Sequence, residues 1–179
     1  MDPARVLVVY YSRTGTTDTV ARAIRSELGC EIEAIHDARH RKGFVGYLRC
    51  GFDAALRRPA KLRAMSSEPG DYDLVIVGTP TWNATVSSPV RTYLLANRER
   101  IRHVAFFCTY GTTDSRRVLH EMQALCVQPP IATVALQADE VRLSRFAPKI
   151  RSFAAALKAA MAYSDAASRA CTDDVPLIA

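Results

Sequence analysis

Arg5-Val-Leu-Val-Val-Tyr-Tyr11 is a continuous run of β-branched and aromatic residues near the start of the chain, and Ser12-Arg13-Thr14-Gly15-Thr16-Thr17 follows it directly. An unbroken apolar run of this kind is typical of a strand that is buried on both faces of a parallel sheet. The polar segment leads into a helical pattern that ends at Gly29 and has Val20, Ala23, Ile24 and Leu28 on one face. The sequence therefore predicts a strand, a polar loop and a helix.

The alternation of strands and helices continues along the chain. Further strands are predicted over residues 30–35, 72–79, 103–108 and 131–136. Helical stripes follow the last three of them: Val90, Tyr93 and Leu94; Val118, Met122 and Leu125; Phe146, Ile150, Phe153, Leu157 and Met161. Strands that alternate with helices pair in parallel through right-handed crossovers, so the fold class is α/β, a three-layer sandwich. Residues 1–163 form a single domain, and residues 164–179, where the pattern stops, are expected to be a loose tail.

Composition excludes several classes of protein. The chain has 179 residues, of which 49% are apolar and 23% are charged, as in a globular domain and unlike a disordered one. No apolar run approaches the roughly 20 residues of a membrane span, and the first residues do not resemble a signal peptide. The five cysteines are odd in number and scattered, without a Cys-x-x-Cys or Cys/His cluster. Reduced thiols, a cytoplasmic location and the absence of a metal site are therefore expected.

The net charge of +6 is concentrated in one segment. Residues 39–63 contain eight basic residues and one acidic residue, whereas the rest of the chain contains 16 basic and 17 acidic residues. Phe44, Leu48, Phe52 and Leu56 recur every four residues inside this segment, so part of it is expected to be helical. A local charge suits contact with an acidic partner, but a solvated helix face with modest ion pairs is favoured over any single docking role. No recognition helix or stacking platform accompanies the charge, so nucleic-acid binding is not predicted.

Residues 12–17 place four hydroxyl groups and a glycine between the first strand and its helix. Backbone N–H groups at a helix N-terminus bind anions, so the loop is predicted to hold a phosphate. The Walker and dinucleotide glycine motifs are both absent, which disfavours ATP, GTP and a dinucleotide. Ordinary helix capping is the alternative, but it needs only one or two hydroxyls. Arg13 either contacts the phosphate or points to solvent.

Two further loops follow the third and fourth strands. Thr79-Pro80-Thr81-Trp82-Asn83-Ala84-Thr85 carries the only tryptophan of the chain among small polar residues, which suits a flat heterocycle. A tryptophan folded back over the edge of the core is an equal alternative. Thr109-Tyr110-Gly111-Thr112-Thr113-Asp114 echoes the first loop, and Tyr110 is placed to face a planar ligand from the side opposite Trp82.

These three loops together resemble the flavodoxin family. Ser12-x-Thr14-Gly15-x-Thr17 is similar to that family's phosphate-binding signature, (S/T)-x-T-G-x-T, and the Thr79-Pro80-x-Trp82 loop with Ser88-Pro89 downstream resembles the TP-x-(W/Y) loop of short flavodoxin-like proteins. The resemblance covers residues 5–163 and implies a five-stranded parallel sheet of order 2-1-3-4-5 that binds FMN non-covalently. It implies that Ser12, Thr14, Gly15, Thr16 and Thr17 hold the phosphate. It implies that the isoalloxazine ring is flanked by Thr79, Pro80, Thr81, Trp82, Asn83, Ala84, Thr109, Tyr110 and Gly111.

Three functions are compatible with this resemblance. The first is an electron-transfer flavodoxin that cycles between redox partner proteins. The second is an NAD(P)H-dependent quinone or nitro-compound reductase, of which a flavodoxin-like protoporphyrinogen oxidase is a narrower version. The third is a non-redox protein that binds another phosphate compound on the same fold. The family's carriers are typically acidic and this chain is basic, a departure that bears on the partner. The flavin carries the chemistry in the first two functions, so no catalytic side chain is predicted.

Overall fold

Among the residues that the structure describes, five parallel strands form the central sheet. The computed structural model describes residues 4–38, 60–112 and 114–172, with the side chains of the last helix described as far as residue 162. The parallel strands are β1 (Val6–Tyr10), β2 (Glu31–Ala34), β3 (Leu74–Trp82), β5 (Val104–Tyr110) and β6 (Thr133–Gln137). Their order is β2-β1-β3-β5-β6, and the short strand β4 (Thr85–Val86) pairs antiparallel with the end of β3. The predicted order of the five parallel strands is confirmed.

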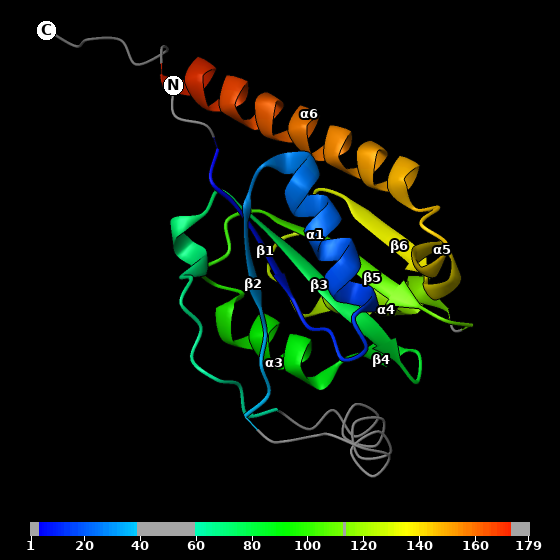
Figure 1. The fold of residues 1–179 in the computed structure, drawn as a ribbon. Helices are drawn as coiled ribbons and strands as arrows, with labels where there is room; N and C mark the ends of the chain where they lie inside the picture. The colour runs from blue at the N-terminus through cyan, green and yellow to red at the C-terminus, as the bar shows by residue number, and fades with distance from the viewer. Residues whose placement is uncertain (1–3, 39–59, 113, 173–179) are drawn as a thin grey trace, which may run out of the picture.

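Helices cover both faces of the sheet (Figure 1). One face packs against α3 (Ser88–Asn97) and α4 (Ser115–Ala124). The other face packs against α1 (Thr16–Leu28), α5 (Ala138–Arg142) and α6 (Ala147–Thr172). The predicted three-layer sandwich is thereby confirmed. Over the described residues, none of these helices combines the length and the apolar character that crossing a membrane requires.

The central strand β1 shows why the sequence folds into layers. Leu7 and Val9 belong to the core beneath α3 and α4, whereas Val8 and Tyr10 belong to the core beneath α1 and α6. Successive side chains of a strand point to opposite faces of the sheet. An unbroken apolar run therefore places apolar side chains on both faces of the sheet. Helices on both faces are needed to bury them.

Close packing in the middle of β3 requires a glycine. A Cβ atom at Gly78 would lie 2.0 Å from the ring of Phe107, which is fully buried on the neighbouring strand β5. Such an overlap cannot be relieved without moving a side chain of the core.

Two predicted boundaries differ from the structure. β3 continues past Thr79 to Trp82, because β4 turns back and pairs with its last residues. Helix α6 continues to Thr172, so residues 164–172 of the expected loose tail are helical. This stretch contains several alanines and neither glycine nor proline, so backbone propensity extends the helix after the apolar stripe has ended.

Most of the basic segment 39–63, with its predicted helix, lies outside the described residues. Its last residues return beside the end of β2: the Ala38 N–H donates to the Lys61 carbonyl at 2.7 Å, and the Arg63 N–H donates to the His36 carbonyl at 2.9 Å. The Ala60 N–H donates to Oγ1 of Thr92 on α3 at 2.9 Å. The segment therefore leaves and rejoins the domain at one place.

Candidate functional site

The carboxyl ends of β1, β3 and β5 meet at one edge of the sheet. Tyr10 of β1 lies beside Gly78 of β3, and Pro80 lies beside Thr109 of β5. The strand order reverses between β1 and β3, and ligands of parallel α/β sheets bind beyond the strand ends at such a reversal. The start of α1 and the β3–β4 hairpin lie at this same end of the sheet (Figure 1). All three predicted segments are brought together there: residues 12–17, 79–84 and 109–111.

The loop after β1 presents backbone N–H groups at the start of α1. Gly15 is the N-cap and has a φ of 93°, a left-handed conformation that favours glycine. Its carbonyl accepts the first helical hydrogen bond from the Thr19 N–H at 2.9 Å, so the N–H groups between these residues precede the helical ladder. Glycine has no side chain with which to cap them. These N–H groups and the positive end of the helix dipole have the arrangement that binds anions in other proteins.

The hydroxyl groups of this loop have two roles: one bonds within the loop, and two others lie beside the N–H groups at the start of α1. Ser12 Oγ accepts a hydrogen bond from the Gly15 N–H at 3.2 Å, which holds the loop in a tight turn. The hydroxyls of Thr14 and Thr16 lie 3.5 Å apart, Thr14 is exposed, and Thr16 and Arg13 are half-buried. The two threonine hydroxyls are therefore available to donate to an anion held by the N–H groups.

Thr17 joins the loop to β5. Its hydroxyl lies 2.8 Å from the hydroxyl of Thr109, and the two residues are 1% and 5% exposed. A buried hydroxyl without a partner is destabilising, so each of these residues satisfies the other. Both were predicted to contact the cofactor directly. In the structure their hydroxyls bond to each other and connect two elements of the site.

A second connection holds α1 against the end of β1. The Tyr10 hydroxyl donates to the Asp18 carboxylate, which also accepts a hydrogen bond from Arg22 Nε at 2.9 Å. The Arg22 guanidinium, and then the Tyr10 hydroxyl, lower the pKa of Asp18. Burial, and then the Asp18 carboxylate, raise the pKa of Tyr10 to about 12. At neutral pH this arrangement fixes the first turn of α1, and with it the loop.

The predicted loop after the third strand is a two-residue hairpin. Trp82 of β3 pairs with Thr85 of β4, and the residues between them, Asn83 and Ala84, have φ values of 47° and 56°. Two positive φ values in succession are typical of a type I′ turn, which matches the twist of a hairpin. The half-buried Trp82 ring meets Tyr11 edge to face, with the ring centroids 5.5 Å apart. The tryptophan is therefore held at the edge of the sheet, next to the start of the loop of residues 12–17.

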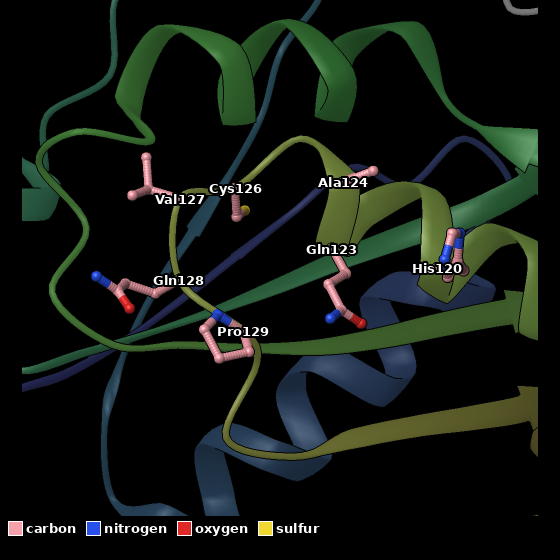
Figure 2. A pocket seen from close by; sticks show the side chains of 7 residues that line it. All are labelled: His120, Gln123, Ala124, Cys126, Val127, Gln128 and Pro129. Atoms are coloured by element: carbon pink, nitrogen blue, oxygen red, sulfur yellow. The ribbon is translucent and has the colours of Figure 1, made fainter.

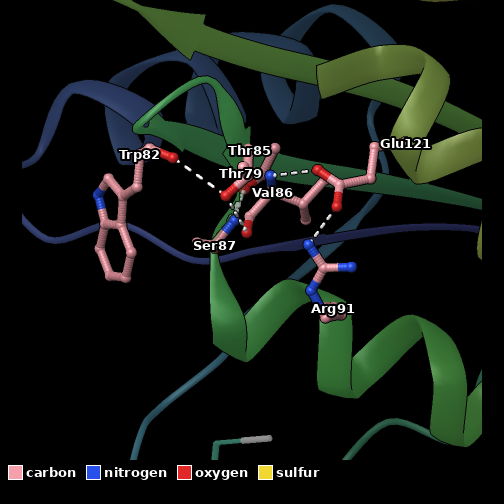
Figure 3. A network of polar contacts seen from close by, with 7 residues as sticks. All are labelled: Thr79, Trp82, Thr85, Val86, Ser87, Arg91 and Glu121. Carbon is pink, nitrogen blue, oxygen red and sulfur yellow. Dashed lines mark hydrogen bonds and ion pairs between the residues drawn. The ribbon is translucent and has the colours of Figure 1, made fainter. Parts of the chain in front are cut away.

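Buried polar groups hold the base of this hairpin (Figure 3). The Thr79 hydroxyl lies 3.0 Å from the Ser87 hydroxyl, and it accepts a hydrogen bond from the Ser87 N–H at 3.2 Å. Thr79 is fully buried, so its side chain supports the hairpin from below. Glu121 of α4 accepts a hydrogen bond from the Val86 N–H at 2.9 Å and forms an ion pair with Arg91 of α3.

The end of β5 completes the edge. Tyr110 is half-buried at the last position of the strand, and Gly111 beyond it is exposed. Burial raises the pKa of the Cys108 thiol, two residues earlier, to about 12. This thiol remains protonated at neutral pH and packs as an apolar group, so thiolate chemistry is not available at this position.

Sequence reasoning missed three residues that shape the site. Tyr11 supports Trp82, and Arg91 and Glu121 hold the hairpin. Arg91 stands two residues after Pro89 in the motif that resembles the TP-x-(W/Y) loop, which was the available signal for it. Glu121 carries no signal in the sequence, because nothing in the pattern of α4 separates it from a solvated helix position.

A cavity of about 300 Å³ lies elsewhere, at the end of α4 (Figure 2). It is lined by His120, Gln123, Ala124, Cys126, Val127, Gln128 and Pro129. The loop from α4 enters β6 at its amino end, so this cavity lies towards the amino ends of the strands, away from the three predicted segments at their carboxyl ends. In the part of the chain that the structure describes, no group of three histidine, cysteine or acidic side chains is placed to hold a metal ion.

Comparison with known families identifies the chain. The model of the NADPH-dependent FMN reductase family matches residues 4–132, which include every strand and loop that forms the candidate site. The chain belongs to the NADPH-dependent FMN reductase family. This membership confirms the predictions of a flavodoxin-like chain and of FMN as its cofactor. No curated protein matches the chain.

Solved structures support the fold of this family member. A flavoprotein from Lactobacillus acidophilus in complex with FMN is 20% identical, with a TM-score of 0.65, and the alignment covers 79% of this chain and 98% of that one. A two-electron reduced flavodoxin from Megasphaera elsdenii is 17% identical, with a TM-score of 0.52 and coverage of 84% and 98%. A WrbA-like flavodoxin from Agrobacterium tumefaciens is 15% identical, with a TM-score of 0.52 and coverage of 87% and 99%. At these identities the likeness shows the fold.

The residues present fit FMN. The glycine N-cap and the N–H groups at the start of α1 suit a phosphate dianion, and the hydroxyls of Thr14 and Thr16 add donors beside them. Trp82 and Tyr110 supply aromatic surface at the neighbouring strand ends. The donor set for the phosphate and the aromatic surface for a ring are therefore at one edge of the sheet, next to each other.

Proposed function

We propose that this chain is an FMN-dependent oxidoreductase that accepts electrons from a reduced nicotinamide and passes them to a small acceptor such as a quinone or a nitro compound. The observation that carries the proposal is the convergence of an anion-binding helix start, Trp82 and Tyr110 at the reversal of strand order. The family match supports NADPH as the donor. An electron carrier, the function that the sequence alone favours first, is the second candidate, because the Ser12–Thr17 segment resembles the phosphate loop of flavodoxins.

The chain contributes binding and orientation. When bound, FMN supplies the acceptance and release of electrons. The backbone of residues 14–17 and the hydroxyls of Thr14 and Thr16 hold the phosphate, while Trp82 and Tyr110 flank the ring and exclude water from it. No side chain of this proposal transfers a proton, and the Cys108 thiol, which is buried and protonated, takes no part.

Spectroscopy of the purified protein tests the proposal. We expect a yellow protein that releases FMN on denaturation. Under anaerobic conditions, NADPH or NADH added without any other protein should bleach the visible flavin band rapidly, and a quinone should restore it. A flavin band that bleaches only when a separate reductase is present would indicate the carrier. A colourless protein that also fails to bind added FMN would leave the non-redox, phosphate-binding function.

The basic segment 39–63 suggests the electrostatic character of a partner. With eight basic residues and one acidic residue, it would attract an acidic protein surface or an anionic substrate. Rates that depend on such attraction fall as salt screens it, since the Debye length is about 8 Å at physiological ionic strength. Turnover with each acceptor should therefore be measured across a salt titration. A flat response would exclude this role for the segment.

A further inference from the structure

Glu121 connects the flavin-flanking hairpin to two helices on the face of the sheet beneath it. Its Oε2 atom accepts a hydrogen bond from the Val86 N–H of β4 at 2.9 Å, and its Oε1 atom accepts one from Arg91 Nη2 of α3. Figure 3 shows Glu121 and Arg91 on one side of the hairpin strand and the Trp82 indole on the other. The Glu121 carboxylate, on α4, therefore accepts a hydrogen bond from the hairpin backbone and is itself held by Arg91 of α3.

Burial makes this arrangement unusual. The side chain of Arg91 is 6% exposed and that of Glu121 is 16% exposed, whereas other ion pairs of the described chain, such as Arg100–Glu68, are about half exposed. Removing two charges from water is costly, and apolar residues in their place often give equal or greater stability. A buried pair of this kind is better explained by the geometry that it imposes than by stability.

The hairpin depends on contacts from outside itself. β4 has two residues, and its ladder with β3 consists of the Thr81–Val86 and Trp82–Thr85 pairs. A two-stranded ribbon of this length is not stable on its own. The Thr79–Ser87 contact holds the point where the chain enters α3, and the bond from Glu121 to Val86 holds the returning strand itself.

We propose that Glu121 is a positioning residue for Trp82. The Glu121 carboxylate, fixed by Arg91, holds the Val86 N–H against α4. This contact sets the position and tilt of the hairpin. The hairpin in turn places the Trp82 indole against the ring of the bound flavin. This role rests on the proposed function for its effect on FMN. Its effect on Trp82 exists in the protein without flavin and is measured there.

The test uses the fact that Trp82 is the only tryptophan. Replacing Glu121 alone would leave the Arg91 charge buried, so the variants are charge-balanced doubles: Arg91→Leu with Glu121→Leu, and Arg91→Leu with Glu121→Gln. The two differ in whether an oxygen remains to accept the Val86 N–H. In the full-length apoprotein, acrylamide quenching of Trp82 fluorescence should rise about twofold in the first double, as the hairpin detaches locally, and should stay near the wild-type value in the second.

Glu140 provides the matched control. Its carboxylate also accepts a backbone N–H, from Gln137 at 3.1 Å, and also pairs with a cation, Lys149 at 2.7 Å, but it lies at the start of α5. Glu140→Leu should leave the quenching of Trp82 unchanged. Equal quenching in the wild type and both doubles would overturn the proposal. A rise of the same size in both doubles would also overturn it, because an acceptor for Val86 would then be irrelevant.

Flavin binding separates this inference from the proposed function. With FMN added, the leucine double should bind about tenfold more weakly, as expected for loss of one charge-assisted hydrogen bond, and its flavin midpoint potential should shift. The expected quenching pattern in a protein that binds no FMN would refute the proposed function and support the hairpin role. The expected quenching pattern with unchanged FMN affinity and potential would overturn the placement of Trp82 against the flavin.

Discussion

The loop after β1 and the hairpin after β3 lie at the same edge of the sheet, but different interactions fix them. The loop is held by its own backbone, by the glycine N-cap of α1, by neutral hydroxyls such as Ser12 and Thr17, and by the partly exposed Asp18–Arg22 pair in the first turn of α1. The hairpin is held by a buried ion pair that reaches it from two helices. A site of many weak backbone donors tolerates most single side-chain changes, whereas a buried charge does not tolerate the loss of its partner. Substitutions should therefore affect the two elements by very different amounts.

The largest effect is expected beneath the hairpin. Arg91→Leu leaves the Glu121 carboxylate buried without its cation and should lower the free energy of unfolding by about 3 kcal/mol. The matching change in the loop, Ser12→Ala, removes one neutral hydrogen bond and should lower it by about 1 kcal/mol or less. Urea denaturation measures both. The Arg91→Leu, Glu121→Leu double should recover part of the loss, because it removes the unpaired charge but leaves the Val86 N–H without its acceptor. Equal effects of the two single changes would remove the contrast between the elements.

The two glycines at the ends of α1 separate folding from phosphate binding. Gly15 and Gly29 have φ values of 93° and 64°, and neither has an atom within 4 Å of an added Cβ, so alanine is strained at both without a clash. Each change to alanine should lower the free energy of unfolding by about 1–2 kcal/mol. Only Gly15→Ala moves the N–H groups that we propose bind the phosphate, so only it should weaken FMN binding, by about tenfold or more. Calorimetric titration of both variants with FMN makes the comparison. Equal weakening would place the phosphate elsewhere.

The hydroxyl pair between Thr17 and Thr109 tests whether the loop depends on the sheet edge. Each single change to valine leaves one buried hydroxyl unsatisfied and should lower the free energy of unfolding by about 1–2 kcal/mol. The double variant should cost less than the sum of the singles, with a coupling of about 1 kcal/mol. A double-mutant cycle in urea measures this coupling. Additive losses would show that the loop is fixed without this contact.

The Tyr10–Asp18–Arg22 contacts predict a pH dependence for the start of α1. Because folding lowers the pKa of Asp18, its stabilising contribution is complete above its ordinary value of about 4 and is lost as the pH falls through the lowered value. The raised pKa of Tyr10 gives the opposite limb, a contribution present below pH 10 and lost as the pH rises towards about 12. Asp18→Asn should lower the free energy of unfolding by about 1 kcal/mol at pH 7. The difference from wild type should shrink below pH 4. Parallel stability curves for the two proteins would contradict this assignment.

The elements that the sequence predicted correctly are those fixed by local pattern. The apolar runs of the central strands β1, β3 and β5 follow from burial on two faces, and the glycine after α1, with its positive φ, follows from backbone sterics. The hairpin was predicted as a loop for equally local reasons. Pro80 removes a ladder donor, and Asn83-Ala84 lacks the Asn-Gly signature of a type I′ turn.

Long-range polar pairs could not be predicted in this way. Thr17 and Thr109 are 92 residues apart, and Arg91 and Glu121 are 30 apart, so only the folded sheet brings either pair together. The sequence motif identified Thr17 and Thr109 as cofactor residues, and whether their backbone touches the cofactor remains a prediction. Their side chains show that a motif can mark residues that build a site as well as residues that bind in it.

The smallest expected effect tests whether the hairpin stores strain for its function. Ala84 adopts a φ of 56°, which glycine adopts freely and alanine does not. Ala84→Gly relieves this strain but increases the entropy of the unfolded chain, so the net gain in stability should be about 0.5 kcal/mol. If the turn merely connects two strands, FMN affinity and potential will be unchanged in the variant. If alanine stiffens the turn beside Trp82, the variant will be more stable and yet bind FMN more weakly, because a freer hairpin holds the indole less well. Thermal unfolding and FMN titration on the same preparation distinguish the two, and a loss of stability would show that the left-handed turn is not strained at Ala84.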